Sequence, residues 1–311
     1  MPSLGPAPER ITVDAEQVQR LITEQFPQWA ALPIRPVDVG GWDNATFHLG
    51  DDMVVRLPTA SEYSLAVAKE HEWLPVLASQ LPLPIPTPLA KGEPGAGYPF
   101  PWSIYSWLDG ETASFDEIAD PVGFADDLAD FVAALRSVDV AGGPRPGKHN
   151  WFRGGTLKTF EPLAQRALRD LAGHVDTDLA REIWADSLGA TWDGVDVWFH
   201  GDLAQGNLLL AGGELAAVID FGTCGVGDPA CDLAIAWTLL TPDGREVFRE
   251  RLGIDDATWA RGRGWALWKT LTMRAGSLGE SDDDAVNDRR VLEEIFAEYA
   301  AFGSGGRAVG A

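Results

Sequence analysis

Residues 200–232 read HGDLAQGNLLLAGGELAAVIDFGTCGVGDPACD, and this stretch decides the fold. A polar loop, residues 200–207, precedes two short apolar segments that are separated by Gly212 and Gly213. Apolar segments of this length, joined by a Gly-Gly pair, are typical of a β-hairpin. The second segment runs into Asp220, where another loop begins. The sequence therefore predicts a two-strand hairpin that is flanked by two acidic loops.

The two loops carry oxygen-bearing side chains in a fixed order. His200, Asp202 and Asn207 have the spacing H-x-D-L-x-x-x-N of a protein-kinase catalytic loop, and Asp220 begins a D-F-G triplet. Phosphoryl transfer needs a carboxylate that orients the attacking hydroxyl and oxygen ligands for Mg²⁺. An Asp or Asn in a turn often only caps backbone groups. The order and spacing of the set favour Asp202 as the catalytic residue, and Asn207 and Asp220 as metal ligands.

Three other side chains of this stretch are assigned structural roles. His200 is more typical of a loop histidine that hydrogen-bonds backbone than of a general base, because Asp202 holds that role. Asp228 precedes Pro229, which is the pattern of a helix N-cap followed by proline at the first helical position. Asp232 falls in the first turn of the same helix, where a carboxylate suits the helix dipole. We expect both aspartates to serve as caps.

Three motifs carry a resemblance to a known family. HGDLAQGNLLL, VIDFG and GDPACDLA resemble the successive motifs of the aminoglycoside phosphotransferase family, which are antibiotic and small-molecule kinases. The similarity extends from Gly40 to about Tyr299, and GGWDNATFHLGDDMVVRLP, KEHEWLP and HNWFRGG are similar to segments of its actinobacterial members. Many members have His and Pro where this chain has Ala204 and Gln205. The resemblance implies an α+β, bilobal protein-kinase-like fold, with a small antiparallel N-lobe and a larger, mostly helical C-lobe.

The N-terminal third has the elements of the small lobe. Apolar spacing predicts a helix over residues 14–26, with Asp14 as its N-cap. Strands are predicted over 33–39, 45–49, 53–57 and 101–108, a helix over 62–80, and an extended connection over the proline-rich 81–88. Helical patterns dominate from residue 115 onward. We therefore divide the chain into an N-terminal nucleotide-binding lobe, 1–108, and a catalytic and substrate-binding lobe, 109–311.

The resemblance and the strand order together place the nucleotide. Gly41 and Asn44 lie in the turn ahead of the second strand, where a kinase covers phosphates with backbone N–H groups. Arg56 stands on the third strand, where kinases have a phosphate-binding lysine, and the resemblance places its partner at Glu70. The adenine edge is expected to meet the backbone of Ser106, Trp107 and Leu108. Trp107 fits a plain core position equally well.

Composition limits the class of protein. A chain of 311 residues with 45% hydrophobic content can form two lobes around a large core. Its net charge of −23 argues against nucleic-acid or anionic-membrane partners, which require a basic surface. A negative field favours a cationic substrate, although it also fits a solvated acidic surface. No apolar run reaches ~18 residues and residues 1–10 lack the apolar core of a signal peptide, so we expect a cytoplasmic protein.

These observations predict a kinase that uses Mg²⁺ to move the γ-phosphoryl group of ATP or GTP onto a hydroxyl of a small molecule. An aminoglycoside-like antibiotic is the preferred acceptor; a macrolide, another natural product or a small hydroxylated metabolite is the alternative, so the role is resistance or metabolism. The acidic candidates for acceptor contact are Asp193, Asp196, Asp282, Asp283, Asp284, Glu293 and Glu294. A nucleotide-binding protein without turnover is the alternative of another class. The sequence leaves the oligomeric state open.

Overall fold

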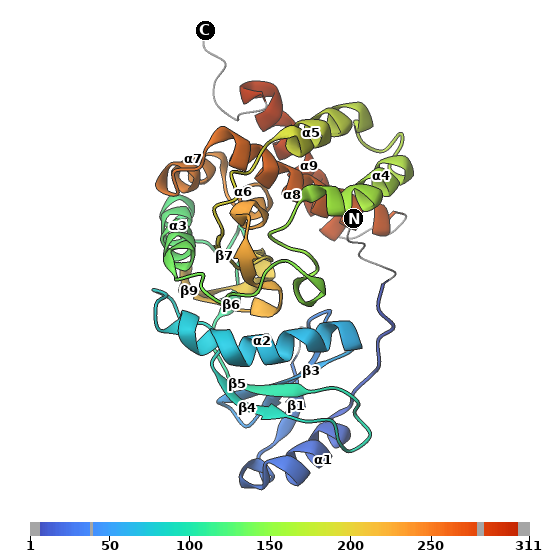
Figure 1. Ribbon diagram of the computed structural model, residues 1–311, viewed down its shortest axis with the longest axis vertical. Helices are drawn as coiled ribbons and strands as arrows, with labels where there is room; N and C mark the ends of the chain where they lie inside the picture. The colour runs from blue at the N-terminus through green and yellow to red at the C-terminus, as the bar shows by residue number, and fades with distance from the viewer. Residues whose placement is uncertain (1–6, 38–39, 279–282, 304–311) are drawn as a thin grey trace.

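The computed structural model describes residues 7–37, 40–278 and 283–303, and its N-terminal part is built on one antiparallel sheet (Figure 1). The strand order is β1-β2-β3-β5-β4. The strands are β1 (Ile34–Pro36), β2 (Asn44–Leu49), β3 (Met53–Pro58), β4 (Pro88–Gly92) and β5 (Trp102–Ser106). The first predicted strand extended to Val39, which lies outside the described residues. The small N-lobe sheet is therefore present as predicted.

Strand β4 is the element of this sheet that the sequence did not predict. The proline-rich segment 81–88 forms no helix, and it leads directly into a strand at the sheet edge. Pro88 is the first residue of that strand, where its missing N–H removes no ladder hydrogen bond. Proline in the pattern thus concealed an edge strand.

Two helices pack against the sheet. Helix α1 (Ala15–Gln25) starts at Asp14, whose carboxylate accepts the N–H of Gln17 at 2.8 Å, and it buries Val18, Leu21 and Ile22. Helix α2 (Ser61–Ala78) lies between the sheet and the C-terminal part of the chain (Figure 1). Because α2 touches both parts, its side chains reach the loops that carry the candidate catalytic residues.

The C-terminal part is mostly helical. Its helices are α3 (Pro121–Ser137), α4 (Glu161–Asp170), α5 (Thr177–Gly189), α6 (Ile235–Thr238), α7 (Pro242–Arg251), α8 (Asp256–Gly276) and α9 (Asp283–Phe302). Helix α7 was not predicted. Helix α8 packs against α4, α5, α6 and α9, and it buries apolar residues around most of its circumference. Within the part of the chain that the structure describes, no helix is both long and apolar enough to cross a membrane.

Two small antiparallel sheets, one of three strands and one of two, bring the acidic loops together. The predicted hairpin consists of β8 (Leu208–Ala211) and β9 (Glu214–Val218), and β6 (Glu111–Thr112) pairs with β8. Strand β7 (Val197–Phe199) pairs with β10 (Gly225–Gly227). The loop 200–207 joins β7 to β8, and the loop that begins at Asp220 joins β9 to β10. The strands before the first loop and after the second loop, β7 and β10, therefore pair with each other, and so do β8 and β9, which lie between the loops.

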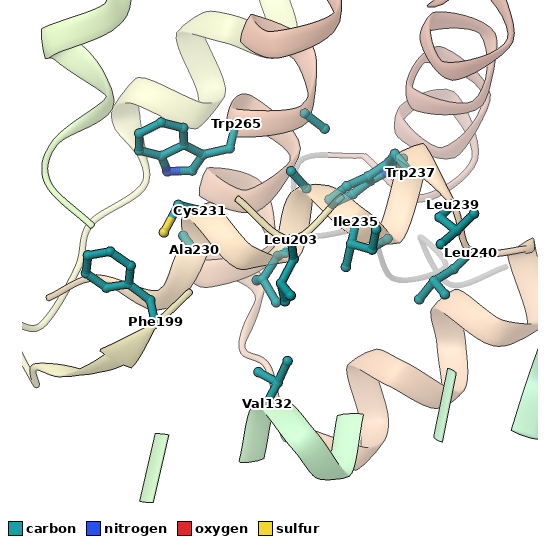
Figure 2. Close-up of a cluster of buried hydrophobic side chains, with 14 of the residues drawn as sticks. Val132, Phe199, Leu203, Ala230, Cys231, Ile235, Trp237, Leu239, Leu240 and Trp265 are labelled. Carbon is teal, nitrogen blue, oxygen red and sulfur yellow. The ribbon is translucent and has the colours of Figure 1, made fainter. Parts of the chain in front are cut away.

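A large apolar core lies beneath these strands. Figure 2 shows part of it, including Val132, Phe199, Leu203, Ile235 and Trp237, all of which are nearly inaccessible to solvent. A second, smaller core joins α1 to one face of the N-terminal sheet. The division into two lobes matches the predicted fold class. β5 ends at Ser106 and β6 begins at Glu111, and the boundary at residue 108 remains a prediction.

Candidate active site

The loop 200–207 is held against the loop after Asp220 at the position of Gly201. Gly201 has a φ of +88°, and a Cβ atom added there would lie 2.6 Å from the carbonyl oxygen of Thr223. No other residue type fits this approach without strain. The hydroxyl of Thr223 also donates to the carbonyl oxygen of His200 at 3.1 Å. The glycine in the H-G-D sequence therefore sets the distance between the two loops.

His200 has the structural role that the sequence predicted. It is fully buried, and its Nε2 atom lies 3.0 Å from the carbonyl oxygen of Ile219. Since a carbonyl can only accept, Nε2 carries the proton, and Nδ1 can accept the N–H of Asp202 at 3.3 Å. The ring also packs edge-on against Phe221. His200 thus joins the catalytic loop to the D-F-G segment.

Asp232 lies in the first turn of the helix, as predicted, but the prediction that it serves as a cap was wrong, and the prediction for Asp228 was incomplete. Asp228 does cap the following helix, through the N–H of Ala230 at 3.1 Å, but it also forms a buried ion pair with Arg261 at 2.7 Å. Asp232 instead accepts the backbone N–H groups of His200 at 2.8 Å and Gly201 at 2.7 Å. A local cap pattern cannot reveal a partner 32 residues away. Asp232 supports the loop that carries Asp202.

Asp202 is charged and closely held. Its Oδ1 atom accepts from Nζ of Lys269 at 2.7 Å, and the amide nitrogen of Asn207 donates to its backbone oxygen at 2.9 Å and to Oδ2 at 3.3 Å. Burial alone would raise the pKa of Asp202, but Lys269 and Arg153 outweigh it and lower the pKa to about 2. The carboxylate is therefore ionised at neutral pH and fixed in orientation.

Asp220 lies beside the cation that the sequence assigned to phosphate. It occupies the left-handed region with a φ of +64°, and its Oδ1 accepts from Arg56 at 2.7 Å. Arg56 also lies 3.8 Å from Glu70, and Glu70 accepts the hydroxyl of Tyr105 at 2.8 Å. Burial raises the pKa of Glu70 although Arg56 opposes this effect. The structure thus brings Arg56, Glu70 and Asp220 together.

Lys69, the neighbour of Glu70, was missed by the sequence reasoning. Its buried ammonium donates to the carbonyl oxygens of Gly222 at 2.7 Å and Cys224 at 2.9 Å. Burial lowers the pKa of Lys69, although nearby Cys224 and Glu70 act in the opposite direction. The contact attaches α2 to the loop that carries Asp220. A buried lysine on a helix gives no local signal, because its acceptors lie more than 150 residues away.

The free oxygens of Asn207 and Asp220 fit a hard cation. The amide nitrogen of Asn207 donates to Asp202, which leaves Oδ1 of Asn207 without a hydrogen bond among the described residues. Oδ2 of Asp220 is likewise without a hydrogen bond there, because Arg56 binds Oδ1. An amide and a carboxylate oxygen suit Mg²⁺, which binds few protein ligands and completes its shell with water and phosphate. The described residues contain no group of three His, Cys, Asp or Glu side chains that could hold a metal.

A cleft beside Arg56, which we call the Arg56 cleft, is lined by residues of both lobes. Its lining includes Asp43, Asn44, Arg56, Glu70, Trp151 and Asp220. Gly41 is exposed and lies outside this lining. Burial, with help from nearby Asp220, raises the pKa of Asp43 to about 7. The sequence assigned its neighbour Asn44 but did not single out Asp43.

The segment after β5 leaves one backbone donor available. The N–H of Ser106 donates to the carbonyl oxygen of Thr87 at 3.0 Å. The N–H of Trp107 donates to the carbonyl oxygen of Asp52 at 2.8 Å. The Trp107 ring packs against His48, with 4.3 Å between the ring centroids. The N–H of Leu108 has no partner among the described residues. Of the three predicted adenine contacts, only Leu108 thus offers an unused N–H group.

This arrangement agrees with a comparison against known protein families. The model of the phosphotransferase enzyme family matches residues 34–265, which is more than half of the chain. The chain belongs to this family. No curated protein sequence matches it significantly.

Solved structures similar to this phosphotransferase share its fold. The GDP complex of an aminoglycoside 2'-phosphotransferase-IIIa is 20% identical, with a TM-score of 0.69, and the match covers 92% of this chain and 99% of that one. A macrolide 2'-phosphotransferase type I is 18% identical, with a TM-score of 0.60 and coverage of 91% and 98%. The macrolide 2'-phosphotransferase MphH from Brachybacterium faecium is 20% identical, with a TM-score of 0.56, and the match covers 90% of this chain and 98% of that one. Identities this low show the fold alone.

On the other side of Asp202, the phosphotransferase has a second cleft, which we call the Lys269 cleft. It is lined by Arg153, Gly201, Asp202, Leu203, Cys231, Ala234, Trp265, Trp268 and Lys269. Figure 2 labels three of these residues, Leu203, Cys231 and Trp265, at the edge of the apolar core. Trp265, Trp268 and Lys269 share one face of α8, as their spacing of three and four residues requires.

None of the acidic residues predicted to contact an acceptor lines the Lys269 cleft. Asp196 pairs with Arg145 at 2.5 Å, and Glu294 with Arg245 at 3.0 Å. Asp193 accepts the N–H of Val195, and Glu293 is exposed. Asp282 and the side chains of Asp283 and Asp284 lie outside the described residues. The sequence signals for the lining of the Lys269 cleft were the lysine within the apolar run ALWKTL and the arginine of HNWFRGG.

Proposed function

We propose that this protein is a small-molecule kinase, which transfers the γ-phosphoryl group of ATP or GTP to a hydroxyl. The observation that carries this proposal is the position of Asn207 between the two acidic loops. Its amide nitrogen binds Asp202, its backbone oxygen accepts the N–H of Ile219 at 2.9 Å, and Asp220 follows directly. The hydrogen bonds of Asn207, itself a proposed metal ligand, thereby connect it to the proton acceptor Asp202 and to the residue before the second metal ligand, Asp220.

Asp202 orients the attacking hydroxyl. Its low pKa makes it a weak base, which suits phosphoryl transfer because the loose transition state requires little proton abstraction before the phosphoryl group moves. The hydroxyl donates to the Asp202 carboxylate, which receives the proton as the new P–O bond forms and the bond to the leaving nucleoside diphosphate breaks. Lys269 and Asn207 keep the carboxylate in one orientation during this step.

The nucleotide occupies the Arg56 cleft in this proposal. Arg56 binds its phosphates and Glu70 holds Arg56 in place, while the backbone around Gly41 and Asn44 covers the phosphate chain. The N–H of Leu108 meets the adenine edge, beside Ser106 and Trp107. Asn207 and Asp220 would hold Mg²⁺, which supplies charge neutralisation at the phosphates when bound.

Two further parts of the proposal concern organisation. We assign residues 1–108 to nucleotide binding and 109–311 to catalysis and acceptor binding, since Arg56 and Glu70 come from the first range and Asp202, Asn207 and Asp220 from the second. The supply of nucleoside triphosphate places the reaction in the cytoplasm. The acceptor is a small molecule. Neighbouring structures in the fold comparison include complexes with kanamycin, gentamicin and streptomycin, so aminoglycosides belong in the first acceptor panel.

The test is the release of nucleoside diphosphate with Mg²⁺-ATP and Mg²⁺-GTP across a panel of aminoglycosides, macrolides and small hydroxylated metabolites. Asp202→Asn serves as the blank, and mass spectrometry of the acceptor identifies the phosphate ester. Release that depends on the acceptor and is absent from the blank supports the kinase. Nucleotide binding with no release for any acceptor would favour a nucleotide-binding protein without turnover.

A further inference from the structure

The Lys269 cleft is positively charged although the chain as a whole carries a net charge of −23. Its charged lining residues are Arg153, Lys269 and Asp202, which gives two cations and one anion. Burial raises the pKa of the only thiol in the lining, Cys231, so this group is neutral. The net charge of the lining side chains therefore has the opposite sign from the charge of the whole chain.

Arg153 forms no ion pair with a carboxylate within the described residues, although the charge of Asp202 is close enough to affect its pKa. Its Nε donates to the carbonyl oxygen of Gly201 at 3.1 Å, and its guanidinium lies 4.8 Å from the ring centroid of Trp268, 5.3 Å from that of Trp265 and 5.4 Å from that of Phe160. The Nη1 atom is buried without a hydrogen bond, and Arg153 forms no ion pair among the described residues. An arginine stays charged, so this guanidinium is a cation with unused donors.

Lys269 supplies the second cation from α8. Its ammonium is bound to Oδ1 of Asp202, and 28% of its side chain remains exposed. An ammonium has three donors, and the contact with Asp202 is the only hydrogen bond that the ammonium of Lys269 forms within the described residues. Two donors therefore remain for a ligand that lies next to Asp202.

The walls between these cations are aromatic. Trp265 and Trp268 line the cleft, and Trp268 keeps its indole N–H buried without a partner. An acceptor in this cleft therefore lies between two cations and two indole rings.

We propose that the acceptor carries an anionic group, a carboxylate or a phosphate, which Arg153 and Lys269 bind while its hydroxyl faces Asp202. This inference rests on the proposed kinase function and names the substrate class of the same site. A carboxylate or phosphate can accept two parallel N–H groups from a guanidinium, which would use the free donors of Arg153. A polycationic aminoglycoside would instead place ammonium groups beside two cations, and like charges at this distance are selected against.

The first test measures binding without turnover. Calorimetric titrations at low ionic strength use four probes with one aromatic ring and different charges: phenyl phosphate, benzoate, benzyl alcohol and benzylamine. Saturating Mg²⁺-ADP occupies the nucleotide side. We expect phenyl phosphate or benzoate to bind at least about 10-fold more tightly than benzylamine, because a charge-assisted hydrogen bond contributes more than a neutral contact. The comparison of phenyl phosphate with benzoate separates the two anion classes.

Matched variants locate the bound anion. Lys269→Gln and Arg153→Gln should each weaken anion binding by about 10-fold or more, and Arg153→Lys should retain part of it. Arg181→Gln, a half-exposed arginine of α5 that pairs with Asp178, is the control and should bind as the wild type does. Because Arg153 packs among three rings, circular dichroism checks the folding of its variants. Lys269→Gln removes the other cation of the cleft and leaves the packing of Arg153 against the rings in place.

Each outcome bears on the proposal. Benzylamine that binds as tightly as the anions, or anions that bind equally well to Lys269→Gln and the wild type, would overturn it. Anion binding that disappears when a non-hydrolysable ATP analogue replaces ADP would also overturn it, because the cations would then serve the γ-phosphate of the donor. Failure of the kinase proposal would appear separately, as no acceptor-dependent release of nucleoside diphosphate in the turnover assay, whichever probe binds in these titrations. A turnover series with glucose, glucosamine, glucuronate and glucose 6-phosphate then extends the charge comparison to hydroxylated acceptors.

Discussion

Replacing Asp232 by asparagine should loosen the catalytic loop. Its carboxylate is almost fully buried and accepts two backbone N–H groups, from His200 and Gly201, at 2.8 and 2.7 Å. Asparagine can accept only one of them and turns its own NH₂ toward the other. A buried N–H without an acceptor costs about 1–3 kcal/mol, and the lost charge-assisted bond adds to this cost. Burial raises the pKa of Asp232, so a neutral side chain recovers part of this loss.

The net effect of Asp232→Asn is a loss of about 3 kcal/mol in the free energy of unfolding. For a chain of this size, that corresponds to a fall in Tm of roughly 6 °C in calorimetry. Asp232→Ala leaves both amides without acceptors and should lower Tm further. Asp178→Asn is the control, because the side chain is 96% exposed and its ion pair with Arg181 contributes little. If Asp232→Asn melted within 1 °C of the wild type, the support of the loop by Asp232 would be refuted.

Three other changes test separate parts of the structure. Arg56→Ala should raise the nucleotide KM and change kcat less, in steady-state kinetics; an unchanged KM would remove Arg56 from the phosphate site. Because the pKa of Asp43 is raised to about 7, the folded protein keeps a proton that the unfolded chain releases above about pH 4. The free energy of unfolding therefore falls between about pH 4 and 7, by up to about 1.4 kcal/mol per pH unit, and Asp43→Asn should abolish this fall in denaturant titrations. If the free energy of unfolding fell with pH equally in the wild type and in Asp43→Asn, the raised pKa of Asp43 would be contradicted. Gly154→Ala places a Cβ 2.0 Å from the Phe199 ring at a φ of +71°, and should lower the free energy of unfolding by about 3 kcal/mol. Gly173→Ala, at a φ of +81° with open space around the new Cβ, should lower it by only about 1 kcal/mol. Equal losses in the two variants would argue against the ring contact.

Local patterns were sufficient for most of the fold. The hairpin at Gly212 and Gly213, the helix that starts at Asp14 and the strands on either side of Gly50 all follow from short-range periodicity and turn residues. Proline concealed β4, because an edge position tolerates a residue that a central strand excludes. The fold class was accessible because motifs with fixed spacing occur within one stretch of about thirty residues.

Apart from Arg56 and Glu70, which the family resemblance supplied, the site could be predicted only where it is local in sequence. Asp202, Asn207 and Asp220 lie within twenty residues, so their spacing carried the chemistry. Lys269 lies 67 residues from Asp202, and Arg153 lies 48 residues from Gly201. Tertiary packing alone brings these cations to the catalytic loop. The charge of the whole chain does not show the charge of this cleft, whose lining holds two cations and one carboxylate.

The most direct test of the central claim compares two quantities for Asp202→Asn on the same preparation: kcat for the best acceptor and the Kd for Mg²⁺-ADP. We predict that kcat falls by about 10²–10⁴, the range for loss of a positioned proton acceptor, while Kd stays within twofold. Asp202 lies outside the lining of the Arg56 cleft, which is the reason for the unchanged Kd. A variant that retains most of its turnover would contradict the assignment of Asp202 as the catalytic residue.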